Sequence, residues 1–452
     1  MPHSADTTKT SSNLEALNEA LNSGAFIQTR RLLNSLPRSE VAHIIEASPP
    51  KVRAVLWQLV NVEHEGGILQ HLSDEVQSQF LREMDTQAVV AIIEGLEADD
   101  IADILQQLPD RVIREVLSSM DHQDRQRIES VLSYPEDTAG GLMNTDVITV
   151  RPKITLDVVL RFLRRHEELP AMTDNLFVVD RRDEFIGLLP LRKVLVSDPS
   201  LTVREIMDTE IEPIPATMHD GKVANLFERY DWVSAPVVDE HNKLLGRITI
   251  DDVVDVIRDD ADHSLMSMAG LDEDLDTFAP VFATWPRRAI WLSFNLLAAF
   301  SAASVINLFQ DSIEKVVALA VLMPIVASMG GVSGTQAFTV VIRGMALEQI
   351  GPQNRNWLLS RELTIGLLNG LFWSMIIALA AAMWFGDPLL GIVIAAAVVI
   401  NMTVAGIAGA GLPMLLKAMN IDPALAGGMA LTTVTDVVGF MSFLGLATWA
   451  YS

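Results

Sequence analysis

Asp436 is the residue of this 452-residue chain whose type and position point most directly to chemistry. It is the only charged residue between Asp422 and the C-terminus, in an apolar segment rich in small residues. A carboxylate near the centre of a membrane span costs about 2.5–3.5 kcal/mol, so it indicates a cation site, a proton relay or a counter-ion. The alternative is an aspartate that joins helices through hydrogen bonds to neighbouring hydroxyl groups, which are those of Thr432, Thr433 and Thr435.

A second polar segment interrupts another apolar run, between Met323 and Gln336. It contains Pro324, glycines at positions 330, 331 and 334, and Thr335. Proline removes a backbone donor and glycine weakens a helix, and free carbonyls inside a membrane are tolerated only against protein or water. The segment therefore indicates either a pore lining or a close contact between two helices. The polar side chains of this segment, together with Asp436, favour the pore.

The distribution of charge places both segments in membrane-spanning helices. Five stretches, uncharged apart from Asp436, are each long enough to cross about 30 Å of hydrocarbon. They are predicted at 289–310, 316–342, 363–386, 388–416 and 424–450, within a transmembrane domain at 287–452. Most basic residues of this half lie on one side, which predicts a multi-pass protein with a cytoplasmic N-terminus, expected in a bacterial inner membrane. The polar residues 1–13 contain no signal peptide and are predicted to be disordered.

The net charge of −25 belongs entirely to residues 1–285, because the remainder contains seven acidic and seven basic residues. A strongly acidic soluble part repels nucleic acid and attracts cations. The chain has no cysteine, and its nine histidines all lie at or before His263. Any metal in the membrane half should therefore be a hard ion that prefers oxygen ligands. No nucleophile with a matching base is recognisable, so no enzyme activity is predicted.

The acidic part contains two internal repeats. In 14–133, breaks recur at a spacing of twelve residues, from Leu36-Pro37 to Met120-Asp121. Most are followed by residues that start helices, which predicts short helices stacked as an α-solenoid.

The second repeat pairs Leu142-Met143-Asn144-Thr145 with Ile206-Met207-Asp208-Thr209. It also pairs Phe177-Val178-Val179-Asp180, followed by Gly187, with Pro236-Val237-Val238-Asp239, followed by Gly246. The two copies resemble tandem CBS domains, at 138–198 and 199–259. This resemblance implies an adenine nucleotide such as ATP as a cofactor, with Thr249 at a phosphate and Asp252 at a ribose. The first copy lacks this Thr and Asp, so at most one nucleotide site is expected. The alternative is a CBS pair that only dimerises.

An acidic run from Asp251 to Asp276 leads through segment 260–286 into the first span. Asp252, Asp255 and Asp259 are spaced i, i+3 and i+7 and therefore share one helical face. Like charges on one face repel each other, and divalent cations would relieve that repulsion. A solvated linker is the alternative interpretation.

Together these features resemble the MgtE family of magnesium channels or transporters over nearly the whole chain. The membrane motifs that carry the resemblance are Pro324…Gly330-Gly331…Gly334…Gln336, Thr339-Val-Val-Ile-Arg343-Gly and Thr432-Thr-Val-Thr-Asp436-Val-Val-Gly439. The implied fold is a multidomain membrane protein with a helical solenoid, an α/β CBS pair, a connecting or plug helix at 260–286 and an all-α domain of five transmembrane helices.

The resemblance implies a homodimer with a pore on its two-fold axis, where Asp436 of each subunit holds a largely hydrated Mg²⁺. Groups near Gly331 and Thr432 would complete the site, and Thr335 would also line the pore. The family motif has asparagine where this chain has Val332 and Thr335, which bears on ion selectivity more than on transport.

Gating by intracellular Mg²⁺ is a further implication of the resemblance. The ion would bridge acidic groups of the N domain, the CBS pair and the connecting helix, and would thereby hold the closed state. The candidate regulatory residues are Asp99, Asp100, Asp103, Asp252, Asp255, Asp259 and Asp262.

Two other functions remain open. Mn²⁺ or Co²⁺ would fit the same oxygen site, and a membrane half that only anchors and dimerises would make the protein a nucleotide sensor. An intramembrane aspartyl protease is disfavoured because it needs two deep aspartates, and only Asp436 qualifies.

Overall fold

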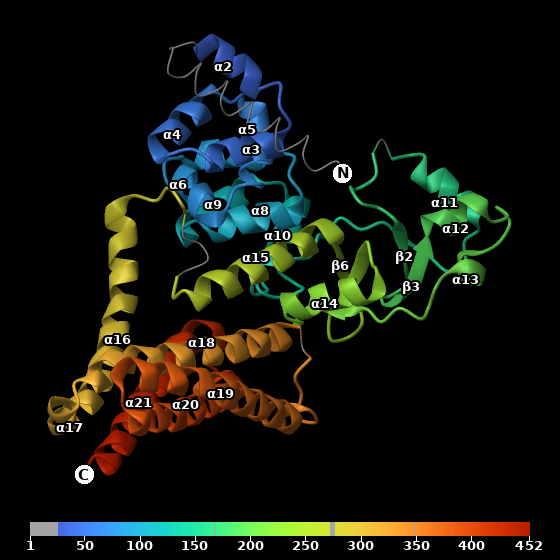
Figure 1. Ribbon diagram of the computed structural model, residues 1–452. Helices are drawn as coiled ribbons and strands as arrows, with labels where there is room; N and C mark the ends of the chain where they lie inside the picture. Colours follow the sequence, from blue (N-terminus) through green and yellow to red (C-terminus); the bar gives the residue numbers. More distant parts are fainter. Residues whose placement is uncertain (1–25, 167, 272–275, 348) are drawn as a thin grey trace. The chain divides into compact units, whose positions relative to one another are not determined.

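The computed structural model describes residues 26–166, 168–271, 276–347 and 349–452. The chain divides into two compact units, one of Met1–Asp260 with Asp274–Pro280 and one of Ala261–Glu273 with Val281–Ser452. In Figure 1 the short helices of the first unit begin in blue, and the long helices of the second are yellow to red. The segment 1–13, predicted to be disordered, lies outside the described residues, as does part of the acidic run, 272–275.

The first unit begins with a row of short helices of eight to eleven residues. They are α2 (Phe26–Leu33), α3 (Arg38–Glu46), α4 (Pro50–Leu59), α5 (Val62–Leu69), α6 (Asp74–Leu81), α7 (Thr86–Ile93), α8 (Ala98–Gln106), α9 (Asp110–Ser119) and α10 (His122–Leu132). Asp85 and Asp121 cap α7 and α10 by accepting backbone N–H groups of the first turn. The breaks that recur in the sequence are therefore helix starts.

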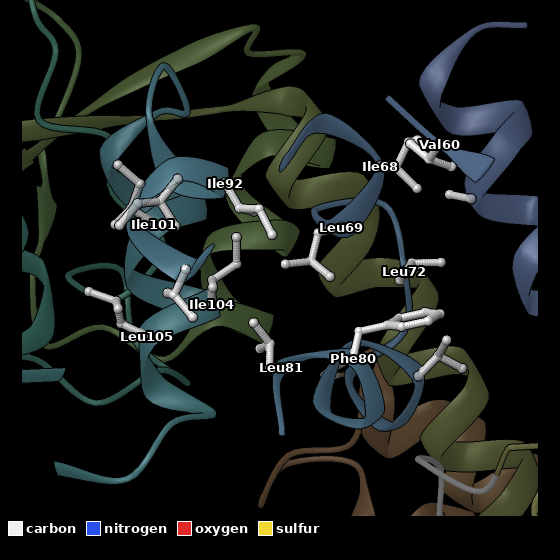
Figure 2. Packing of buried hydrophobic residues seen from close by; sticks show 14 of the residues in the cluster. Val60, Ile68, Leu69, Leu72, Phe80, Leu81, Ile92, Ile101, Ile104 and Leu105 are labelled. Atoms are coloured by element: carbon white, nitrogen blue, oxygen red, sulfur yellow. The ribbon is translucent and has the colours of Figure 1, made fainter. Parts of the chain in front are cut away.

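Alternate helices of this row pack against each other, α3 with α5, α5 with α7, and α7 with α9. Figure 2 shows Leu69, Leu81 and Ile104 pointing into one interior from three different helices. Each helix is too short to be stable alone, so the shared core supplies most of its stability. The predicted stack of short helices is confirmed.

Two three-stranded sheets of identical topology follow. The first repeat contains β1 (Thr149–Val150), α11 (Leu156–Leu163), β2 (Asn175–Val179), β3 (Phe185–Pro190) and α12 (Leu191–Val196). The second repeat contains α13 (Val203–Ile206), β4 (Ile214–Pro215), α14 (Asp220–Tyr230), β5 (Ser234–Val238), β6 (Leu244–Thr249) and α15 (Ile250–Met268). In each sheet the first two strands are parallel and the last two antiparallel. The α/β pair predicted from the repeat is confirmed.

The two repeats hold each other through their glycines. A Cβ at Gly246 would lie 2.6 Å from the carbonyl oxygen of Asn144, and one at Gly187 would lie 2.4 Å from that of Asp208. Asn144 and Asp208 are equivalent positions of the repeat, and each forms a bridge to the other copy's last strand. Only glycine permits this approach, which explains why both repeats have it.

The segment 260–286 is not the single connecting helix that the resemblance implies. Residues up to Met268 belong to α15, which ends before Gly270 at a positive φ of 69°. A new helix begins at Val281, directly after Pro280, because proline disfavours a helical conformation in the residue before it.

Among its described residues, the second unit contains five helices that are long and apolar enough to cross a membrane. They are α16 (Val281–Leu308), α18 (Ala318–Ala346), α19 (Arg355–Phe385), α20 (Pro388–Ala418) and α21 (Pro423–Ala450), and each contains or overlaps one predicted span. A short helix, α17 (Gln310–Lys315), separates the first two. In the bundle α20 packs against α18, α19 and α21, and it is the most buried of the five.

Candidate functional site

Asp436 lies half-buried at the middle of α21. The three hydroxyl groups beside it donate to carbonyls of their own helix: Thr432 to Gly428 at 3.0 Å, Thr433 to Met429 at 2.9 Å and Thr435 to Thr432 at 3.0 Å. A hydroxyl has one proton to donate, so these groups are not donors to the carboxylate. The hydrogen bonds to these three threonines, on which the helix-joining alternative depends, are therefore not formed in this structure.

The predicted pore residues lie on two helices that pack against each other, α18 and α21. A Cβ at Gly439 would lie 3.4 Å from Val326, and one at Gly334 would lie 3.0 Å from Leu431. The position in α21 therefore falls from 439 to 431 as the position in α18 rises from 326 to 334, so the two helices are antiparallel. The stretch between these two contacts places Gly331 at about the level of Asp436, within one helical turn.

The helix α18 remains continuous through Pro324 and the glycines. Gly331 has open space on its Cβ side, and its carbonyl accepts a hydrogen bond of 2.9 Å from the Thr335 hydroxyl. Thr335 and Thr432 are both exposed in the single chain, and so is Val332, at 58%. In one copy of the chain, Thr335 and Thr432 are therefore uncovered on the two helices that carry Gly331 and Asp436.

In the first unit, helix α8 packs on the second CBS repeat, and Ala102 and Val253 share one apolar core. Glu97 accepts a hydrogen bond from Asn144, and Arg127 forms an ion pair of 2.8 Å with Asp146, so polar contacts also join the helical row to the start of the first repeat. This packing brings acidic residues from distant parts of the sequence together.

We call this set the acidic cluster, and it comprises Asp99, Asp100, Asp103 and Asp252. Burial, with Asp100 as the next cause, raises the pKa of Asp99 to about 7, and one of its oxygens has no hydrogen-bond partner. Burial and the charge of Asp252 raise the pKa of Asp100 to about 7. Burial and the charge of Asp99 raise the pKa of Asp252 to about 8. Each value reports the cost of ionising a carboxyl group beside others in partly dry surroundings.

Asp103 completes the acidic cluster although it is an exposed residue. Desolvation by the protein atoms around its carboxyl group, followed by the charges of Glu136 and Asp99, raises its pKa well above the ordinary value. The other predicted regulatory residues are not in this set. Asp255 has a pKa raised by burial and is influenced by Arg258 and His71, Asp259 is exposed, and Asp262 belongs to the second unit.

The acidic cluster is not a preformed metal cage. Among the residues that the structure describes, no three His, Asp or Glu side chains are arranged to hold a metal ion. A cation there would act through its waters or after a small movement of the side chains, as suits an ion that keeps its hydration shell.

Comparison with known proteins places the chain in one family. Residues 323–446 match the model of a divalent cation transporter, MgtE, residues 36–137 match the MgtE intracellular N domain, and residues 139–198 and 203–259 match CBS domains. A magnesium transporter MgtE from Thermus thermophilus is 32% identical over 96% of this chain and 97% of its own length. The chain belongs to the MgtE family.

Other members show the same extent of similarity. The magnesium transporter MgtE of Bacillus subtilis is 28% identical over 95% of each chain. Among solved structures, the cytosolic domain of the Mg²⁺ channel MgtE in complex with ATP is 32% identical and covers 54% of this chain and 99% of that one, with a TM-score of 0.49.

Thr249 and Asp252, the two residues of this MgtE chain that were predicted to contact a nucleotide, are hydrogen-bonded to each other. Thr249 donates its hydroxyl proton to Asp252 at 2.9 Å, and this bond lowers the pKa of Asp252 against the larger effect of burial. A cavity of about 300 Å³ is lined by Tyr134, Pro215–Thr217 and Val238–His241. Neither Thr249 nor Asp252 lines this cavity.

Sequence reasoning missed several buried polar groups, among them those of Arg53 and Asn401. Arg53 of α4 forms two hydrogen bonds with the carboxylate of Asp276, at 2.6 and 2.8 Å, and the side chains are 2% and 4% exposed. Asn401 is buried in α20. The argument used for Asp436 applies to Asn401 too, because it is a lone strong hydrogen-bonding amide in an apolar span. No local pattern pairs Arg53 with a residue 223 positions away.

Proposed function

We propose that this MgtE-family protein transports Mg²⁺ across a membrane along a path lined by Asp436, Gly331, Thr335 and Thr432. The observation that carries the proposal is the half-buried carboxylate of Asp436 at the middle of α21, with the adjacent threonine hydroxyls occupied by backbone carbonyls. Mg²⁺ loses water reluctantly and is held well by a few carboxylates through its waters. Carbonyl and hydroxyl oxygens on the facing helix supply further contacts to such waters.

The transporting form is proposed to be a homodimer. In one copy the exposed oxygens of Thr335 and Thr432 would face lipid, which polar groups in a membrane avoid. A second copy related by a two-fold axis would cover this face and add its own Asp436, giving two negative charges for one divalent ion. The distribution of basic residues supports a cytoplasmic N-terminus in a bacterial inner membrane.

Regulation by intracellular Mg²⁺ is proposed to act at the acidic cluster. The raised pKa values of Asp99, Asp100 and Asp252 mean that ionised carboxylates repel each other when α8 lies on α15. A divalent cation binding there would remove this repulsion and stabilise the packed arrangement. Asp255, Asp259 and Asp262 would extend the same response along α15. Loss of the ion would release the interface and favour the conducting state.

An adenine nucleotide such as ATP is proposed to compete with this regulatory ion. Asp252 is shared by the acidic cluster and by the predicted nucleotide contacts, so a ribose bound there would displace Thr249 from its carboxylate. Measured ATP affinity should therefore fall in Asp252→Asn and depend on Mg²⁺ in the wild type.

Uptake of Mg²⁺ into proteoliposomes tests the proposed transport. Asp436→Asn keeps the shape and removes the charge, and uptake should fall at least about tenfold, since a divalent ion loses its charged partner. The matched control is Asp387→Asn, because asparagine still caps α20 and uptake should change less than about twofold. Uptake that survives Asp436→Asn would place the path elsewhere.

Competition by Mn²⁺ and Co²⁺ in the same assay addresses a broader cation range. The exposed apolar side chain of Val332 on the polar face of α18 favours this second candidate, because it contributes no hydrogen bond to the hydrated ion. Absence of uptake for every divalent ion would support a sensor whose membrane unit only anchors it.

A further inference from the structure

The amide of Asn401 occupies the point where three helices of the membrane unit meet. Its side chain is 0% exposed, and its nitrogen donates a hydrogen bond of 2.9 Å to the carbonyl oxygen of Val326 in α18. Its oxygen has no hydrogen-bond partner among the described residues. The amide thus ties α20 to α18 with one bond and leaves its acceptor unused.

Two glycines make room for this amide. A Cβ at Gly330 of α18 would lie 2.2 Å from the Asn401 nitrogen, and one at Gly439 of α21 would lie 2.7 Å from it. Real side-chain contacts are longer than both distances, so any larger residue would push α18 or α21 away from α20. The spacing between α18 and α21 at this level is therefore set by the amide of Asn401.

The same level contains the proposed ion path. Gly330 precedes Gly331, whose carbonyl accepts from Thr335, and Gly439 is three residues after Asp436 on the same helix. A shift of either helix against Asn401 would therefore move the carbonyl oxygens of α18 relative to the carboxylate. Mg²⁺ demands near-octahedral oxygen geometry and is more sensitive to such a shift than larger divalent ions.

Stability alone gives no reason for an asparagine at this position. A buried amide oxygen without a partner is unfavourable, and an apolar side chain of similar volume would avoid that cost. The hydrogen bond to Val326 differs from apolar packing because it has a direction and fixes the rotation and height of α18 beside α20.

We infer that Asn401 is a positioning residue for ion selection, which sets the distance between the Gly331 carbonyl and the Asp436 carboxylate through its contacts with Gly330, Gly439 and Val326. The inference rests on the proposed Mg²⁺ transport. Asn401 itself does not touch the ion, because it is enclosed between the helices.

The test compares the full-length wild type with Asn401→Leu in proteoliposomes, with Mg²⁺ uptake measured alone and against Mn²⁺ and Co²⁺. Leucine fills the site without the hydrogen bond, so thermal unfolding in detergent should be nearly unchanged while the preference for Mg²⁺ falls at least about fivefold. The matched control is Ser374→Ala in α19, a buried hydroxyl bonded only to its own helix, which should retain the wild-type preference.

A pair of variants keeps the test informative if leucine prevents folding. Gly439→Ala alone should lose uptake and stability, because its methyl group meets the amide. Combining it with Asn401→Ala removes that clash, so stability should return, whereas the preference for Mg²⁺ should not.

A wild-type preference in Asn401→Leu, or in the double variant, would overturn the inference while leaving Mg²⁺ transport intact. If the wild type takes up no divalent ion, the proposed function fails, and the inference fails with it.

Discussion

The acidic cluster and Asp436 are carboxylates in partly dry surroundings, but they differ in their neighbours. Asp252 lies among other acids, and their charges add to the effect of burial on its pKa. Asp436 is the only charged residue in α21. A group of carboxylates responds to protons and cations by changing how two elements pack, whereas a lone carboxylate in a span can only offer its charge to a visiting ion. The difference separates a sensor from a conduction site.

The largest effect that distinguishes the acidic cluster from Asp436 is expected in how thermal stability changes with pH. Asp99, Asp100 and Asp252 of the cluster have folded pKa values of about 7 to 8, above the value of about 3.9 in an unfolded chain. The folded state therefore holds protons that the unfolded state has lost, and the free energy of unfolding falls as pH rises through this window. Without divalent ions, we expect the Tm of the protein in detergent to fall on the order of 10 °C between roughly pH 5.5 and 8.5.

Asp252→Asn should reduce this dependence on pH, and Mg²⁺ should restore the wild-type Tm at the alkaline end. Asp198→Asn is the control, because its carboxylate is exposed and bonds only to neighbouring Ser200. If Tm changes with pH in Asp252→Asn as it does in the wild type, the acidic cluster holds no protons near neutral pH. The proposed electrostatic difference between the cluster and Asp436 would then be contradicted.

An intermediate effect is expected on the membrane side from Thr335→Val, which retains the shape and removes the hydroxyl bonded to Gly331. Uptake should fall about fivefold, the equivalent of roughly one hydrogen bond, and so less than in Asp436→Asn. Thr364→Val is the matched control, since its hydroxyl also bonds a carbonyl four residues earlier but lies on α19. Equal losses in both variants would indicate a general effect of helix hydroxyls rather than a pore lining.

The smallest effect is expected from Thr249→Val. The Thr249 hydroxyl stabilises ionised Asp252, so its removal should raise the pKa of that carboxyl further and weaken cation binding. Inhibition by internal Mg²⁺ should need about threefold more ion, with maximal uptake unchanged. Ser200→Ala removes a similar hydroxyl from an exposed carboxylate and should leave inhibition as it is. A fall in maximal uptake in Thr249→Val would contradict the separation of the two sites.

The sequence predicted correctly those features that depend on neighbouring residues, and not those that depend on contacts between distant residues. The five spans and the short helices are encoded in neighbouring residues, through apolar length and helix starts, and the structure reproduces them. The convergence of Asp100 with Asp252 depends on packing between residues 152 positions apart, which Ala102 and Val253 direct. The family resemblance implied that an ion bridges acids of these two domains, but the sequence did not show which of the seven candidates meet.

The errors have the same origin. The family resemblance implied a connecting helix at 260–286, yet one helix ends before Gly270 and the next begins after Pro280. The face shared by Asp252, Asp255 and Asp259 follows from helical spacing, but only Asp252 is covered by α8. Spacing defines a face, and tertiary packing decides which part of it acquires partners.

The measurement that tests the separation of sensor and conduction site most directly is Mg²⁺ flux in proteoliposomes as internal Mg²⁺ is varied, for the wild type, Asp252→Asn and Asp436→Asn. Asp252→Asn should retain the maximal flux of the wild type and require at least about fivefold more internal Mg²⁺ for inhibition. Asp436→Asn should conduct little at every internal concentration. Loss of maximal flux in Asp252→Asn together with normal flux in Asp436→Asn would contradict the account.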